Sequence, residues 1–201
     1  MKTAAIAAAC GLLIVSSPAS AERTADYAMD EARFAELAAK LEVTGFRPMP
    51  ERGAVDVELG DIKGIDHQLS ILGIFCSAWK VENPLSQMVT RALGAWDRDG
   101  ELTPAAAGET SIRLTLDAAN SMMRCVQIGE LKTRCLISTS ITGTASRMKA
   151  GVAENFPVVI DISQEQKMSG ACNGLAQGSS LAGRGASLAL VDRLAEIAAA
   201  P

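Results

Sequence analysis

Apolar residues at spacings of three and four positions predict three helices, because this spacing gathers them on one helix face. Asp30 is available to cap the first helix, and we expect Asn83 to cap the second. In the third helix we expect Arg184 to face outward, away from the apolar stripe. The predicted helices are Thr24–Glu42, a segment that starts at Pro84 and stops at Asp97, and a segment from Ser179 or Ser180 to Ala199.

Alternating apolar and polar residues predict strands in the middle of the chain, since successive side chains of a strand point to opposite faces. We expect a turn at Ala119-Asn120 and a tight turn at Gly129-Glu130 that closes a hairpin. Ile62–Ile74 fits neither period, and Ser146–Asn155 is polar, so we expect a loop there. The predicted strands are Val55–Leu59, Gly73–Val81, Ile112–Leu116, Ser121–Ile128, Leu131–Thr144 and Phe156–Ser163.

Strands dominate the middle of the chain and helices flank them, which predicts an α+β fold. We expect a single globular domain over residues 22–201, because about 180 residues are enough for one hydrophobic core. Its sheet would be mostly antiparallel, with about five strands packed by two or three helices. One of these is the C-terminal amphipathic helix.

Residues 1–21 have the composition of a secretory signal peptide. Lys2 supplies a positive charge and Ala4–Val15 forms an apolar run. Ala19 and Ala21 occupy the small-residue positions that precede a cleavage site. The apolar run is too short to span a bilayer, which takes roughly 20 residues. We therefore expect cleavage after Ala21.

The mature chain would then begin at Glu22, in the periplasm or outside the cell. Cys10 offers an alternative, because it follows small residues and could become a lipidated N-terminus. The apolar run continues past Cys10, which favours cleavage after Ala21. Either route exports the chain to an oxidising compartment, where disulfides persist.

Four cysteines follow the leader, and this even number predicts two disulfides. A turn centred near Glu130 places Cys125 opposite Cys135, close enough to bridge. Cys76 and Cys172 then pair by default and close a long loop. Other pairings and buried free thiols stay open as alternatives. Because no Cys-x-x-Cys occurs and no Cys or His pair has zinc-ligand spacing, we expect no metal and no cofactor.

The charge balance argues against nucleic acid as a partner. Without the leader the chain has 18 basic and 23 acidic residues, whereas phosphate binding requires clustered Lys and Arg. Two Trp, four Phe and one Tyr offer few stacking platforms for bases or sugars. No segment after the leader is long and apolar enough to cross a membrane. The single histidine, His67, is interpreted as a surface or structural residue rather than a catalytic one.

Two short motifs resemble known sites without completing them. The segment around Asp97, Asp99 and Gly100 resembles the middle of an EF-hand calcium loop. Alignment on Gly100 puts Ala95 and Ala106 at the first and last ligand positions, so we expect an acidic turn instead. The Ser-x-x-Lys pair of penicillin-recognising enzymes occurs twice without its partner motifs, at Ser77…Lys80 and Ser146…Lys149.

Small residues at the start of the last helix suggest two further roles. Backbone N–H groups in Gly178–Gly185 could hold an anion at the helix N-terminus. No Gly-Lys-Ser/Thr follows, so the segment is not a phosphate loop. We expect Ser179 or Ser180 to act as the helix cap instead.

The sequence favours an exported protein of the bacterial cell envelope, of a non-enzymatic binding or accessory type. Its partner would be another envelope protein, a lipid or a small apolar ligand, met through an exposed apolar patch or groove. One alternative is a small secreted hydrolase with facing carboxylates such as Asp97, Asp99 and Glu101. Another is an assembly subunit that pairs through a sheet edge.

Overall fold

The computed structural model describes residues 22–72, 76, 79–130, 132–169 and 172–201. The predicted leader, with Cys10, Ala19 and Ala21, lies outside these residues. The elements in chain order are β1 (Glu22–Thr24), α1 (Glu31–Lys40), β2 (Asp56–Leu59), the 3-10 helix η1 (Lys63–Ile65), β3 (His67–Gln68), β4 (Ser70–Leu72), β5 (Lys80–Asn83), α2 (Leu85–Trp96), β6 (Ser111–Gly129), β7 (Lys132–Lys149), β8 (Val152–Ser169), the 3-10 helix η2 (Cys172–Gly174) and α3 (Leu175–Ala199).

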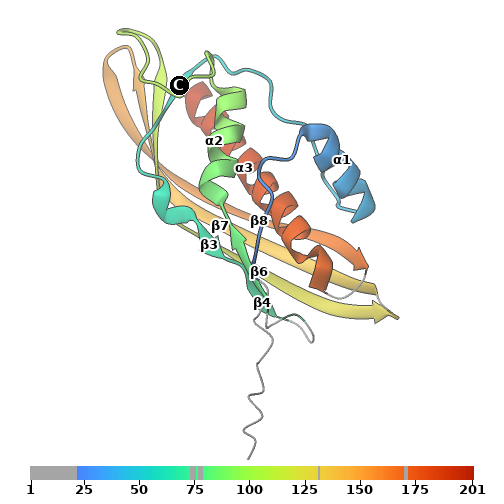
Figure 1. Cartoon of the computed structure of the whole chain (residues 1–201). Helices are drawn as coiled ribbons and strands as arrows, with labels where there is room; N and C mark the ends of the chain where they lie inside the picture. Colours follow the sequence, from blue (N-terminus) through green and yellow to red (C-terminus); the bar gives the residue numbers. More distant parts are fainter. Residues whose placement is uncertain (1–21, 73–75, 77–78, 131, 170–171) are drawn as a thin grey trace, which may run out of the picture.

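The strands form a five-stranded and a three-stranded sheet. In the larger sheet β6, β7 and β8 are antiparallel neighbours, while β2 and β4 pair in parallel with opposite ends of β6. The smaller sheet has the order β1-β5-β3. Figure 1 shows α2 and α3 lying across one face of the long strands, with α1 beside α3. The predicted α+β class, with a mainly antiparallel five-stranded sheet and a C-terminal helix packed on it, is confirmed.

β6 is one strand of 19 residues rather than the two strands expected from the sequence. The chain does not turn at Ala119-Asn120. Its register with β7 instead shifts between Leu116 and Ala118, where a bulge absorbs the irregularity. Gly143 lies opposite Leu116, and a Cβ on Gly143 would lie 2.2 Å from the carbonyl oxygen of Thr115. Glycine at this position therefore lets the two strands stay paired through the bulge.

The loop expected over Ser146–Asn155 is also wrong. β7 continues to Lys149, and β8 begins at Val152 as its direct partner. Ala150 and Gly151 turn the chain with φ angles of 51° and 78°. Two successive residues with positive φ form the tight turn that suits a two-residue hairpin. The polar composition indicated a loop, but these residues are polar because one face of the strands is exposed to water.

The first predicted helix is shorter than expected. Its N-cap is Asp30, as the sequence suggested, and the Asp30 carboxylate accepts a hydrogen bond from the Arg33 N–H at 2.7 Å. Thr24, the first residue of the predicted helix, instead ends β1, which pairs in parallel with β5, and residues 25–29 are neither helix nor strand. The predicted strand Gly73–Val81 falls largely outside the described residues, and β5 begins only at Lys80.

α2 matches its predicted span, but Asn83 does not cap it. Asn83 ends β5, where its side-chain nitrogen donates to the Ser121 hydroxyl at 3.4 Å. The carboxylate of Asp66 accepts hydrogen bonds from both the backbone N–H and the hydroxyl of Ser86, each at 2.7 Å. Asp66 therefore caps α2 from 20 residues upstream.

α3 begins at Leu175, about one turn before the predicted start. Ser179 and Ser180 therefore lie inside the helix, fully buried, and the expectation that they cap it is wrong. The Ser180 hydroxyl accepts the Asp26 N–H at 2.7 Å and donates to the carbonyl one turn earlier. Because Gly178–Gly185 contains no helix N-terminus, the anion-site hypothesis is also wrong.

Two groups of buried apolar side chains form the interior. One lies between the long sheet and the helices α2 and α3. The other joins α1 to the opposite end of the sheet, and includes Phe34, Met123, Ile137 and Leu175. The second group means that the N-terminal helix and the β6–β7 hairpin are held by one shared core.

Two disulfides crosslink the chain. Cys125 and Cys135 lie directly opposite each other in the β6–β7 register, with Cα atoms 4.1 Å apart. Cys76 is bonded to Cys172 across a sequence separation of 96 residues. These are the pairs that the position of the hairpin turn predicts. Two disulfides indicate an extracytoplasmic protein, because such bonds persist in oxidising compartments. Over the described residues, no helix has the length and apolar character needed to cross a membrane.

Candidate functional site

The outer face of the larger sheet, opposite α2 and α3, is exposed. In β7, Ile137, Thr139 and Ile141 point into the core, whereas the alternate residues Ser138 and Ser140 point outward. An antiparallel sheet often has one hydrated face of this kind. The outward positions of β7 between Leu136 and Met148 all carry hydroxyls: Ser138, Ser140, Thr142, Thr144 and Ser146.

An apolar cluster interrupts this polar face at the end where β6 turns into β7. We call it the hairpin patch, and it comprises Leu72 (51% exposed), Met122 (37%), Val126 (58%), Ile128 (45%) and Leu136 (42%). Single exposed apolar side chains are common on any protein. Five gathered on three neighbouring strands form a candidate docking surface.

Strand register places four of the five patch residues on one face. Arg124 is the partner of Leu72 on β4 and of Leu136 on β7, so these three side chains lie in one row across the sheet. Met122 and Val126 are two residues before and after Arg124, and therefore project from the same face of β6. Cross-strand neighbours at this spacing are in reach of one another.

A hollow of about 390 Å³ opens on the same face beside the hairpin patch. Met122 and Leu136 belong to its wall, and so does Arg124, which makes the hollow continuous with the patch. The Ser138 and Ser163 hydroxyl oxygens lie 2.9 Å apart in the same wall. The remaining lining residues are Asn120, Thr139, Ser140, Asp161 and Ile162.

Basic side chains surround the hairpin patch. Arg124, Lys132 and Arg134 lie in or beside it, and the only acid between residues 122 and 137 is Glu130. Arg134 Nε lies 3.1 Å from Glu165 Oε1 at the surface. Arg124 and Lys132 form no ion pair with any residue that the structure describes. Glu165 of β8 lies opposite Leu136 and neutralises Arg134, so Arg124 and Lys132 are the cations at the patch without a described counter-ion, in a chain whose net charge is −4.

The Cys125–Cys135 disulfide holds the hairpin on the face opposite the patch. Cys135 is fully buried in the core shared with α1. The bond fixes two strands in one register directly beneath Val126 and Leu136. The hairpin patch is therefore presented on a preorganised platform, which lowers the entropic cost of docking.

A second cavity, of about 430 Å³, lies where β3 and β5 meet the N-terminus of α2. His67 lines it, half-buried, and its Nδ1 lies 2.8 Å from the Ile65 carbonyl oxygen. Asp66 is already engaged as the cap of α2, and Glu82 adds a second acid to the wall. The Ile65 carbonyl therefore orients the His67 ring, and a structural role for His67 stays a prediction.

Asp97, one of the carboxylates considered for catalysis, is 1% exposed and fully engaged by backbone groups. Its Oδ1 accepts N–H bonds from Asp99, Gly100 and Glu101 at 2.6 to 3.2 Å. Its Oδ2 accepts the buried Val57 N–H at 2.7 Å. The EF-hand-like segment is thus an acidic turn that Asp97 closes and ties to β2.

The neighbouring carboxylate of Asp56 is also engaged. Asp56 is 5% exposed, and the Arg98 guanidinium contacts it while lying 2.6 Å from Glu109. Burial raises the pKa of Asp56 above its ordinary value, Arg98 opposes this rise, and Asp99 adds to it. Because Arg98 lies between Asp56 and Glu109, these two do not face each other across an open cleft. Neither cavity described above is lined by these groups.

The Ser-x-x-Lys pairs do not form a nucleophile site in the described residues. Ser146 and Lys149 lie in the same strand, three residues apart, so their side chains point to opposite faces. The Ser146 hydroxyl donates to the Asn155 side chain at 2.7 Å. Ser77 lies outside the described residues.

β8 is an edge strand of the larger sheet. The Lys167 N–H points away from β7 and donates to the Leu41 carbonyl at 2.8 Å, so the loop after α1 covers that end. Along β8 the backbone N–H groups point alternately toward β7 and away from it, and the register with β7 is unbroken. The backbone nitrogen of Pro157 therefore points away from β7, like that of Lys167. Proline has no N–H to offer there, so this edge is poorly suited to strand addition.

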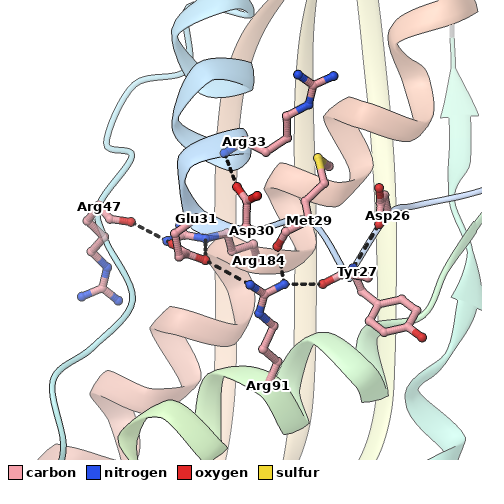
Figure 2. A network of polar contacts seen from close by, with 10 residues as sticks. Asp26, Tyr27, Met29, Asp30, Glu31, Arg33, Arg47, Arg91 and Arg184 are labelled. Atoms are coloured by element: carbon pink, nitrogen blue, oxygen red, sulfur yellow. Dashed lines mark hydrogen bonds and ion pairs between the residues drawn. The ribbon is translucent and has the colours of Figure 1, made fainter.

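Two arginines hold the N-terminal segment against the helices (Figure 2). Arg184 of α3 forms an ion pair with Glu31 at 2.5 Å and donates to the Arg47 carbonyl at 2.8 Å. Arg91 of α2 donates to the Tyr27 carbonyl at 2.8 Å. The expectation that Arg184 faces outward is wrong, because these partners stabilise its buried charge beneath α1.

Sequence reasoning did not select the hairpin patch, although a signal for it was present. Residues 122–128 contain apolar residues at adjacent positions, Met122-Met123 and Cys125-Val126. Strict alternation would leave one face of a strand polar, so adjacent apolar residues put apolar side chains on both faces. One set fills the core and the other forms the patch.

Comparisons with known proteins do not assign the chain to a family. No protein family matches it, and no curated protein sequence does. It is similar to a solved structure described as the crystal structure of an uncharacterized protein, with 10% sequence identity and a TM-score of 0.30. The similarity covers 74% of this chain and 95% of the other. A likeness at this TM-score carries no functional information.

Proposed function

We propose that this protein is a non-enzymatic binding or accessory protein of the cell envelope, exported by a leader cleaved after Ala21. It docks on an apolar partner through the outer face of its larger sheet. The observation that carries the proposal is the hairpin patch, whose exposed aliphatic side chains gather beside a hollow on a mostly polar face. Apolar surfaces of this kind typically mark interaction sites.

The engagement of Asp56 and Asp97 favours binding over hydrolysis by these two carboxylates. Acid–base catalysis requires two carboxyl groups that can reach a substrate. Asp97 accepts four backbone hydrogen bonds, and Asp56 is covered by Arg98. Docking by strand pairing along β8 is disfavoured in turn by Pro157 and by the loop that covers Lys167.

The docking role is tested with an anilinonaphthalene sulfonate dye, whose fluorescence rises in apolar surroundings. We expect saturable enhancement with the native protein and a several-fold loss in the double variant Met122→Ser/Leu136→Ser. Val159→Ser is the matched control, because Val159 is 60% exposed on the same face but outside the patch. Near-UV circular dichroism must show native packing in all three proteins, since loosely packed states also bind this dye.

Two results would contradict the docking role. One is the absence of dye binding to the native protein. The other is equal binding by the native protein and by the double variant, which would place the dye elsewhere.

Export is tested separately, by the intact mass of the protein recovered from the envelope fraction. We expect a chain that begins at Glu22 and has all four remaining cysteines oxidised. An uncleaved chain with reduced thiols would contradict this part of the proposal.

A further inference from the structure

We propose that the hairpin patch docks the protein on an anionic phospholipid surface. The inference rests on the docking role proposed above and names the partner. It follows from the composition of the patch, from the charge around it and from its place at an end of the sheet.

The apolar side chains of the hairpin patch are all aliphatic. Its members are Leu, Met, Val and Ile, without Trp or Tyr. Trp, Tyr and Arg are the residues that typically dominate binding at protein–protein interfaces. Aliphatic side chains beside Lys and Arg are instead typical of surfaces that enter the boundary between lipid headgroups and acyl chains.

Arg124 combines both kinds of contact. It lies in the row between Leu72 and Leu136, where its aliphatic stem can cover apolar surface while the guanidinium reaches outward. Lys132 lies at the start of β7, beside the exposed Ile128 at the end of β6. Since neither cation has an ion-pair partner among the described residues, both are available to phosphate groups.

The charge around the hairpin patch complements an anionic surface. Three basic residues, Arg124, Lys132 and Arg134, lie around the patch with two acids, Glu130 and Glu165, and Glu165 is paired with Arg134. The whole chain has a net charge of −4, so the rest of the protein is repelled by the same surface. This contrast orients the protein with the β6–β7 hairpin toward the lipid. Each accessible cation near an anionic leaflet raises affinity about fivefold.

The position of the hairpin leaves the approach open. Figure 1 shows the end of β6 extending beyond the start of α3, away from the helical layer. The outer face of the sheet at this end can therefore meet a flat surface without contact from α2 or α3. The disulfide between Cys125 and Cys135 keeps the two strands together during contact.

Vesicle flotation with the whole mature protein tests the proposal. Vesicles of phosphatidylcholine alone are compared with phosphatidylcholine vesicles rich in phosphatidylglycerol, at low and at high salt. We expect binding to the anionic vesicles only, weakened by salt. The double variant Arg124→Gln/Lys132→Gln should bind about 25-fold more weakly. Val126→Ser/Ile128→Ser should also reduce binding, because it removes the side chains that enter the lipid.

Arg113→Gln is the matched control. Arg113 lies on the same face of β6 at the other end of the sheet, with its side chain 62% exposed, and it should not alter binding. Equal binding to both kinds of vesicle, or an equal loss with Arg113→Gln, would overturn the proposal. Soluble glycerol phosphate, added in excess, should not release the protein; if it does, the site recognises free phosphate rather than a lipid surface.

The vesicle and dye experiments separate the two proposals. If the dye binds at the hairpin patch but neither vesicle does, the lipid inference is wrong and the docking role stands. If neither the dye nor the vesicles bind, both are wrong.

Discussion

Arg184 and Glu31, on the last and the first helix of the chain, form an ion pair in which the arginine side chain is only 5% exposed. The Arg184 guanidinium also lies 4.5 Å from the centroid of the Phe46 ring and 5.5 Å from that of Phe34. A buried cation destabilises a protein unless charge and hydrogen bonds compensate it. Glu31 therefore contributes more to the fold than its position near the surface suggests.

Glu31→Gln should lower the free energy of unfolding by about 2 kcal/mol, because it leaves the buried Arg184 charge without its counter-ion. The loss is smaller than for a fully buried pair, since Glu31 is 36% exposed on its side chain. Urea unfolding followed by circular dichroism measures it. Glu36→Gln is the control, because the Arg33–Glu36 pair is exposed and contributes less than about 0.5 kcal/mol. Equal losses in the two variants would contradict the assignment.

Asp97→Ala should destabilise the protein by about 2–4 kcal/mol, because the buried N–H of Val57 and three N–H groups of the turn lose their acceptor. Asp97→Asn, which keeps one side-chain oxygen, should fall between the native protein and Asp97→Ala. Asp99→Asn serves as the control, because Asp99 contacts Asp97 through its backbone N–H, which this substitution leaves in place. Thermal unfolding ranks the four proteins, and native-like stability of Asp97→Ala would refute a structural role.

The two disulfides should differ in their contribution to stability. In the chain-entropy account, the separation of 10 residues between Cys125 and Cys135 is worth about 2–3 kcal/mol. The separation of 96 residues between Cys76 and Cys172 is worth about 4–5 kcal/mol. The paired serine variants should therefore unfold at different urea concentrations, with the loss of the longer loop costing more. The opposite order would mean that the Cys125–Cys135 bond stabilises the folded state in addition to restricting the unfolded chain.

Asp56 should make stability depend on pH in a particular direction. Its pKa is raised in the folded protein above the ordinary value of 3.8, so the folded state binds a proton more readily than the unfolded state. Its ionisation then opposes folding at neutral pH, and this cost disappears as pH falls toward the ordinary value. The free energy of unfolding of the native protein, relative to Asp56→Asn, should rise as pH is lowered from neutral. Urea titrations of both proteins at several pH values measure it, and a fall would contradict the raised pKa.

The spacing of apolar residues predicted where most helices and strands of this fold lie. It did not predict where each element begins and ends. Leu85–Trp96 was predicted because its apolar stripe is complete, and its true cap, Asp66, lies 20 residues away in sequence. The Ser146–Asn155 hairpin was mistaken for a loop because its residues meet water on one face. Such errors arise when a distant partner or a hydrated surface, rather than local preference, decides the conformation.

The same limit explains the prediction for Arg184. From local sequence alone, a charged residue is expected on the outer side of a helix. The partners of Arg184, Glu31 and the Arg47 carbonyl, are distant in sequence and cannot be inferred from the residues around it. The pairing of Cys125 with Cys135 was accessible because it follows from one short turn. The hairpin patch was less accessible because an apolar residue in a strand does not reveal whether a helix covers it.

Pro157 has a consequence for the behaviour of many copies of this protein. On β8, the edge strand of the larger sheet, Pro157 has no backbone N–H to donate. The backbone N–H of Lys167 already donates to the loop after α1. A ladder that is interrupted twice is a poorer template for the next molecule. Crowded copies therefore have less tendency to join their sheets through β8.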